Sequence, residues 1–204
     1  WAGAHPRMVE ALSSLLRQDY PDLLPVLVTA TAEEPAAGLI RTLRRIPGPA
    51  ACGGRSGRGC GQKNHNSLQG VAAVGDAADV YVFCDSTHLA AEDFVRCLVG
   101  PVARGEAAFS TGYHTVEPRD QRPVTLAYAL SVLLMRFLQA LSAFTQPWGG
   151  AMAMSRAAFE RYGVAELWAH NVVDDCSWRA AAGPGRACAS VRRGLAAHRA
   201  ADHA

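Results

Sequence analysis

Several features that would each point to a definite class of protein are missing from this sequence. Its 20 Lys and Arg residues nearly balance 18 Asp and Glu residues, so the net charge of +2 does not indicate a nucleic-acid partner. Its six cysteines show no Cys-x-x-Cys spacing, which disfavours a zinc site and a disulfide scaffold and favours a reduced, cytosol-facing compartment. The first residues contain no signal-peptide pattern, and no internal repeat is evident. These absences leave an ordinary globular domain.

The composition sets the size of that domain. Half of the 204 residues are apolar and 19% are charged, which is enough for one domain with a sizeable core. We predict a single domain over residues 1–182. The Ala- and Arg-rich residues 183–204 are treated as a separate tail.

Apolar segments of strand length alternate with segments of helical periodicity. We predict strands at 24–29, 80–84 and 107–113, and helices at 6–18, 35–45, 64–74, 90–99 and 121–144. The Gly-rich residues 47–62 are predicted to form a loop, and they match neither a Walker loop nor a Gly-x-Gly-x-x-Gly turn. This alternation predicts an α/β fold with a mainly parallel sheet flanked by helices on both faces.

The apolar segment 124–144 is about as long as a membrane-spanning helix. It contains Arg136 and Gln139, which are costly at the centre of a bilayer. We therefore expect a buried helix, or one that lies at a membrane interface, and a spanning helix is the alternative.

Two acidic sites lie far apart in the sequence. Asp85 directly follows the predicted strand 80–84, and thus lies at the carboxyl edge of a sheet, where open α/β folds bind ligands. Asp174 and Asp175 follow a segment rich in small residues and could face Asp85 across a cleft. One acid that holds a metal and a diphosphate, and another that accepts a proton from a hydroxyl, are the minimum for sugar transfer.

Simpler interpretations remain for each of these residues. Asp85 is also a suitable N-cap, and Asp174 and Asp175 also suit a helix N-terminus, where acids are favoured. His88 is either a metal ligand or a surface histidine at a helix start. Trp148 either stacks on a sugar ring or packs in the core.

Five segments, taken in order, resemble a family of glycosyltransferases. They are SLLRQDYP at 14–21, GQKNHNSL at 61–68, FCDS at 83–86, GGAMAMSR at 149–156 and VDD at 173–175. The chain up to about residue 182 is similar to processive-type family 2 or ceramide-glucosyltransferase-like family 21 glycosyltransferases, which implies a GT-A fold. Because that family has a strand ahead of the first helix, we expect that the sequence lacks this strand.

The resemblance implies a role for each matching residue. Asp175 is the expected general base with Asp174 supporting it, and Asp85 is the expected ligand of a divalent cation, Mg²⁺ or Mn²⁺. The expected donor-binding residues are Lys63, Asn64, Asp85 and Ser86, with Lys63 facing the diphosphate. The expected acceptor- and sugar-binding residues are Trp148, Gly149 and Gly150.

The implied function is inverting transfer of a hexose from a nucleotide-sugar, expected to be a UDP-sugar, to a lipid or glycan hydroxyl. Such an enzyme of glycolipid biosynthesis is associated with a membrane surface, on its cytoplasmic face. Two departures favour an alternative, a catalytically inactive GT-A-like domain for binding or assembly. The second acid of the usual Asp-x-Asp is absent after Asp85, and the Gln/Arg-x-x-Arg-Trp signature is absent after Asp175. A nucleotidyltransferase ranks last, because no pyrophosphorylase loop follows the first predicted strand.

Overall fold

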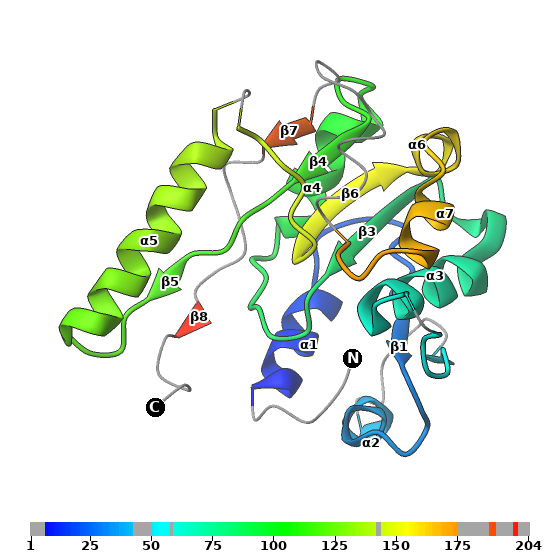
Figure 1. Ribbon diagram of the computed structural model, residues 1–204, viewed down its shortest axis with the longest axis horizontal. Coiled ribbons are helices and arrows are strands. Elements are labelled where there is room, and N and C mark those ends of the chain that lie inside the picture. The colour runs from blue at the N-terminus through cyan, green and yellow to red at the C-terminus, as the bar shows by residue number, and fades with distance from the viewer. Residues whose placement is uncertain are drawn as a thin grey trace.

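The computed structural model describes residues 7–42, 50–57, 59–141, 144–174, 188–190 and 198–199, and they form a mixed α/β structure (Figure 1). The helices are α1 (Met8–Leu16), α2 (Pro35–Thr42), α3 (Gln62–Val74), α4 (Phe94–Ala103), α5 (Pro123–Gln139), α6 (Arg156–Arg161) and α7 (Val164–Ala169), with a 3₁₀ turn η1 (Gly75–Ala77). The strands are β1 (Leu27–Thr29), β2 (Ala50–Cys52), β3 (Val80–Cys84), β4 (Phe109–Thr111), β5 (Val116–Glu117), β6 (Ala151–Ser155), β7 (Cys188–Ser190) and β8 (His198–Arg199).

The prediction of an α/β chain is confirmed, but the described strands do not form a mainly parallel sheet. The largest sheet has the order β3-β6-β4-β7, and β6 pairs antiparallel with both β3 and β4. Parallel pairing is limited to the pairs β1–β2, β4–β7 and β5–β8 among the described strands. The difference arises at β6, since the chain enters it after a short turn at residues 145–150 and runs back between its two neighbours.

The period-two alternation of β6 builds a core on each face of this sheet. Met152 and Met154 pack with Trp168 and other large side chains under α6 and α7. Ala151 and Ala153 point to the opposite face, where they pack against the apolar side of α4. The sheet is therefore covered on both faces.

A cavity of about 780 Å³ separates β1 from β3. Both strands line it, together with parts of α1 and α3, and its polar lining residues include Lys63, Asp85, Ser86 and Thr87. Among the described strands, β1 pairs only with β2, and β3 pairs only with β6. The two sheets are thus separated at the point where the polar residues lie.

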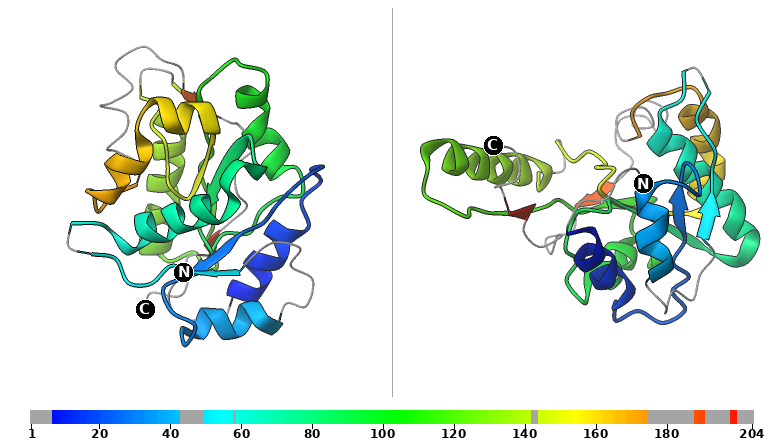
Figure 2. Two further views of the ribbon diagram at one scale, coloured as in Figure 1. Left: turned by 90° about the vertical axis from the view of Figure 1, so that its right-hand side faces the viewer. Right: turned by 90° about the horizontal axis from the view of Figure 1, so that it is seen from below.

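Helix α5 projects from the body of the molecule, as the right-hand view of Figure 2 shows. Most of its large apolar side chains are exposed: Val124, Leu126, Tyr128, Leu130, Leu133, Leu134, Met135 and Phe137. The predicted helix over 121–144 is thus confirmed in a shorter form. Because the helix is exposed, the expectation of a buried helix is wrong. Within the described residues, no helix is both long enough and apolar enough to cross a membrane.

Candidate functional site

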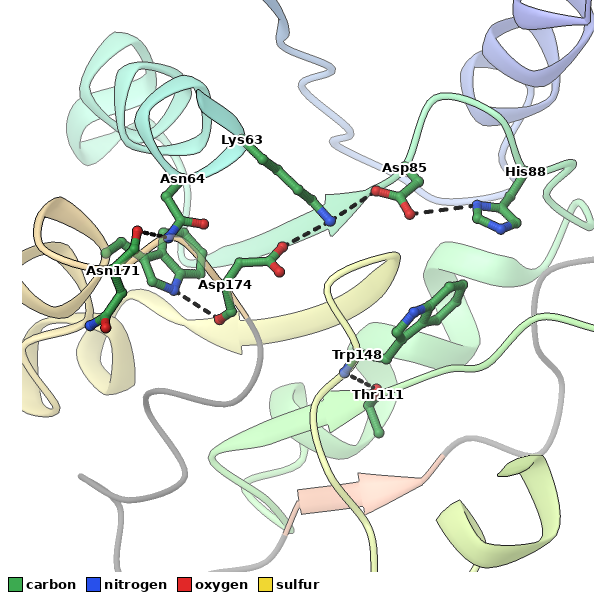
Figure 3. A network of polar contacts seen from close by, with 9 residues as sticks. Lys63, Asn64, Asp85, His88, Thr111, Trp148, Asn171 and Asp174 are labelled. Carbon is green, nitrogen blue, oxygen red and sulfur yellow. Dashed lines mark hydrogen bonds and ion pairs between the residues drawn. The ribbon is translucent and has the colours of Figure 1, made fainter. Parts of the chain in front are cut away.

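Lys63 joins the two acidic sites that the sequence separates (Figure 3). Its Nζ is 2.9 Å from Asp85 Oδ1 and 2.8 Å from Asp174 Oδ2. Lys63 lies in the first turn of α3, Asp85 directly follows β3, and Asp174 lies beyond α7. The fold therefore brings together three of the residues expected at the site.

The charges of the acids keep Lys63 protonated. Partial burial alone would lower the pKa of Lys63, but the nearby carboxylates of Asp85 and Asp174 outweigh that effect and raise the pKa above its usual value. The exposed fraction is 46% for the lysine side chain, 33% for Asp85 and 10% for Asp174. The ammonium is therefore open to solvent on one side, whereas Asp174 is almost enclosed.

Lys63 is the only lysine in the 204-residue sequence, although arginines are frequent. A lysine ammonium is a compact point charge with three donors, so it can lie between two carboxylates from different segments. The planar fork of an arginine instead favours one carboxylate. The presence of one lysine among many arginines is a feature of the sequence that singles out Lys63, and the motif spacing alone does not show it.

Gly149 makes room for Asp174. A Cβ on Gly149 would overlap the carboxyl group of Asp174, and even the farther oxygen, Oδ1, would lie only 2.5 Å from it. The backbone oxygen of Asp174 accepts a hydrogen bond of 3.0 Å from Nε1 of the buried Trp168. The backbone of Asp174 is thus held by Trp168, and its carboxyl group occupies the space that the missing side chain of Gly149 leaves.

The segment before Asp174 is attached to the start of α3. The Gly61 N–H donates to the Asn171 carbonyl at 3.0 Å, and the Asn64 amide nitrogen donates to the same oxygen at 2.7 Å. A Cβ on Gly61 would clash with the backbone of Val172, whose carbonyl carbon would be 3.1 Å away. These contacts explain how a residue near the end of the described chain reaches Lys63.

Asn64 has a structural contact that its sequence motif did not predict. It is completely buried, and its side chain holds the Asn171 backbone instead of lining the cavity. Asn64 therefore positions the segment that carries Asp174, and a direct role in donor binding stays a prediction. Ser86 lines the cavity beside Asp85 and is half-buried, and its donor-binding role stays a prediction.

Asp85 is not a helix cap in this structure. Helix α4 begins at Phe94, with Asp93 in the N-cap position, and the segment that follows Asp85 is a turn. The Asp85 N–H donates to the Gly150 carbonyl at 3.1 Å, which continues the pairing of β3 with β6. This bond places the backbone of Asp85 beside that of Gly150.

An aromatic cluster lies next to Asp85. The Trp148 indole is 5.0 Å from the rings of Tyr113 and His114 and 5.2 Å from that of His88, measured between centroids. Gly150 permits this packing, because a Cβ there would be 2.7 Å from indole atom Cε2. Trp148 is half-buried and is therefore both part of a packed cluster and open to a ligand.

His88 is buried and does not lie on the surface at a helix start as one expectation had it. Its Nδ1 is 3.9 Å from Asp85 Oδ2, so it borders the acid that the sequence identified. Tyr113 and His114 were missed, because they follow the short strand β4 and no motif includes them.

The remaining expected residue, Asp175, lies outside the described residues, and its role as general base stays a prediction. Within the described part of the chain, no group of three or more His, Cys, Asp or Glu residues could hold a metal ion. The two carboxylates at Lys63 nevertheless suit Mg²⁺, which is typically bound by one or two carboxylates plus waters and substrate phosphates. The cavity volume of about 780 Å³ is within the range of small-molecule sites.

No known protein family and no curated protein sequence matches the chain. The chemistry of the residues around Lys63 is therefore the basis on which a function can be assigned.

Proposed function

We propose that this chain is an inverting glycosyltransferase domain of the GT-A type. It would move a hexose from a nucleotide-sugar, a UDP-sugar in the first instance, to a lipid or other membrane-near hydroxyl. The observation that carries this proposal is the ion pairing of Lys63 with both Asp85 and Asp174, beside a cavity that Lys63 and Asp85 line. All three belong to the segments that resemble the family, and the fold gives each a place at one site.

On the donor side, Lys63 supplies a positive charge that can bind the diphosphate through charge-assisted hydrogen bonds. Asp85 and Asp174 supply oxygen ligands for a divalent cation, and the cation would offset charge on the leaving diphosphate. The cavity beside them provides room for the nucleotide, with Ser86 on its wall.

On the acceptor side, Asp175 is the proposed general base. Asp174 is engaged by Lys63 and nearly buried, so it is poorly placed to take a proton from an acceptor hydroxyl. The role of base is assigned to Asp175 by analogy with the acid pair of the family, in which the second acid is the base. A base must come within hydrogen-bond reach of the hydroxyl that it deprotonates.

The acceptor is proposed to be a lipid because of α5. Eight large apolar side chains of this helix are exposed, which is typical of helices that rest in a membrane interface. The aromatic cluster around Trp148 offers a face on which a sugar ring could stack beside Asp85.

A second candidate is an inactive GT-A-like domain that binds without catalysis. The absence of a second acid after Asp85 favours it, since this leaves the cation with fewer ligands on that loop. An inactive domain would bind a nucleotide-sugar, or a partner, without turning it over.

Titration calorimetry with UDP and UDP-sugars, with and without Mn²⁺, tests the proposal. We expect binding that depends on Mn²⁺ and that is lost, or loses its Mn²⁺ dependence, in Asp85→Ala. Asp76→Ala is the matched control, since Asp76 lies before the other end of β3 with a side chain that is 97% exposed. Unchanged UDP-sugar affinity and an unchanged response to Mn²⁺ in Asp85→Ala would refute the proposed site.

A further inference from the structure

The Lys63 ammonium lies at the one point on which the oxygens of Asp85 and Asp174 converge. Divalent cations bind carboxylate oxygens at about 2.0–2.6 Å. A cation bound by both acids would thus take nearly the position of Nζ. Lys63 and such a cation exclude each other.

The charges at the site oppose the binding of a diphosphate alone and of a divalent cation alone. One positive and two negative side chains leave an excess negative charge, which opposes a diphosphate as long as the acids are uncompensated. A divalent cation alone must first displace an ammonium that already neutralises one of the acids. When both ligands bind, the diphosphate can take Lys63 and the cation can take the carboxylates.

The structure allows the lysine to move while the acids stay in place. Lys63 has a flexible four-carbon stem and a side chain that is 46% exposed. The Trp168 indole donates to the backbone oxygen of Asp174, whose carboxyl group lies against Gly149, and the backbone N–H of Asp85 donates to the Gly150 carbonyl. The site therefore has two acids with an anchored backbone and one lysine side chain that is free to move away from them.

We propose that Lys63 is a displaceable occupant of a divalent-cation site formed by Asp85 and Asp174, and that it couples cation binding to diphosphate binding. This inference rests on the proposed function, because it takes the second ligand to be a nucleoside diphosphate. By the reciprocity of linkage, each ligand strengthens the other by the same factor, about 5- to 150-fold for typical coupled sites.

The first test is calorimetry on the full chain with Mn²⁺ alone, UDP alone and each in the presence of the other. In the wild type, Mn²⁺ and UDP should each bind more tightly, by one common factor, when the other is present. In Lys63→Met, Mn²⁺ alone should bind more tightly than in the wild type, UDP alone more weakly, and the coupling factor should fall toward one. Arg96→Met is the control, because it removes a basic partner of the exposed Asp19 elsewhere on the surface.

The second test needs no substitution. Because Lys63 is the only lysine, protein labelled with ¹⁵N-lysine has one side-chain ammonium signal. UDP with Mg²⁺ should shift this signal, and an excess of Mg²⁺ alone should shift it only at much higher concentration. A signal that does not respond to UDP with Mg²⁺, at concentrations where calorimetry shows both bound, overturns the inference.

The outcomes separate this inference from the proposed function. Mn²⁺ and UDP that bind independently, or a Lys63→Met variant with unchanged Mn²⁺ affinity, overturn the inference and leave the proposed function standing. If UDP does not bind at any Mn²⁺ concentration, the proposed function fails and the coupling fails with it. A gain of Mn²⁺ affinity in Lys63→Met then still supports the cation site.

Discussion

Gly149→Ala adds one methyl group at the place where the site is most tightly constrained. The new Cβ would overlap the Asp174 carboxyl group, which lies against the glycine. The carboxyl group must move, and it loses its 2.8 Å contact with Lys63. We therefore expect that Gly149→Ala disrupts the contact between Asp174 and Lys63, while the chain still folds.

The expected magnitude follows from these contacts. Overpacking a tight site costs about 1–3 kcal/mol, and the lower end applies here, because the overlapping atoms end a side chain that can rotate. The lost ion pair adds about 0.2–1 kcal/mol at most, since Lys63 is half-exposed and screened by solvent. A loss of about 1–2 kcal/mol corresponds to a decrease of roughly 2–8 °C in Tm for a domain of this size.

The assay combines urea unfolding with calorimetry of UDP and Mn²⁺. Gly57→Ala is the control, because no heavy atom lies within 4 Å of the position that its added methyl group would take, and it should leave both quantities unchanged. Gly149→Ala should lose donor affinity by tenfold or more, where each tenfold step is about 1.4 kcal/mol. The reasoning is refuted if stability falls by the expected amount while donor affinity stays at the wild-type value.

Three further predictions concern other parts of the chain. Asp175→Asn should lower the transfer rate by about 10²–10⁴ with donor affinity retained, whereas Asp174→Asn should weaken donor binding; a parallel loss of rate and affinity in Asp175→Asn would exclude a general base. Burial raises the pKa of the Cys84 thiol to about 12, so Cys84 should resist alkylation at pH 8 until urea unfolds the chain, as mass spectrometry of the labelled peptide can show. Fast labelling of native Cys84 would contradict this. Helix α5 should carry the protein to the top of a liposome flotation gradient, and exchange of the exposed Leu130 and Phe137 for Ser should abolish flotation; carbonate-resistant binding would instead indicate a span.

The local elements of the fold were largely predictable from the sequence. The strand at 80–84 matches β3 at both ends, and the helices α1, α3 and α5 begin within about two residues of the predicted starts. Their apolar periodicity is set by residues adjacent in the chain. Strand β6 was missed because its Ala and Met residues have no strong preference for strands, and it is stabilised by β3 and β4 on either side.

The site was predictable in its residue types but not in its contacts. The motifs identified Lys63, Asp85 and Asp174, yet nothing in their spacing showed that one ammonium would bridge both acids. That contact depends on Gly61 and Gly149, whose close approaches arise between segments far apart in the sequence. A sequence pattern can show that a glycine gives the backbone freedom. It cannot show which other residue packs against the glycine, and this is known only from the fold.

The most direct measurement is a crystal structure of the full chain with UDP and Mn²⁺, in which anomalous scattering locates the metal. We predict a Mn²⁺ peak between Asp85 and Asp174, with Lys63 moved to the diphosphate. A metal found elsewhere, or UDP bound away from this site with Lys63 still between the two acids, would contradict it.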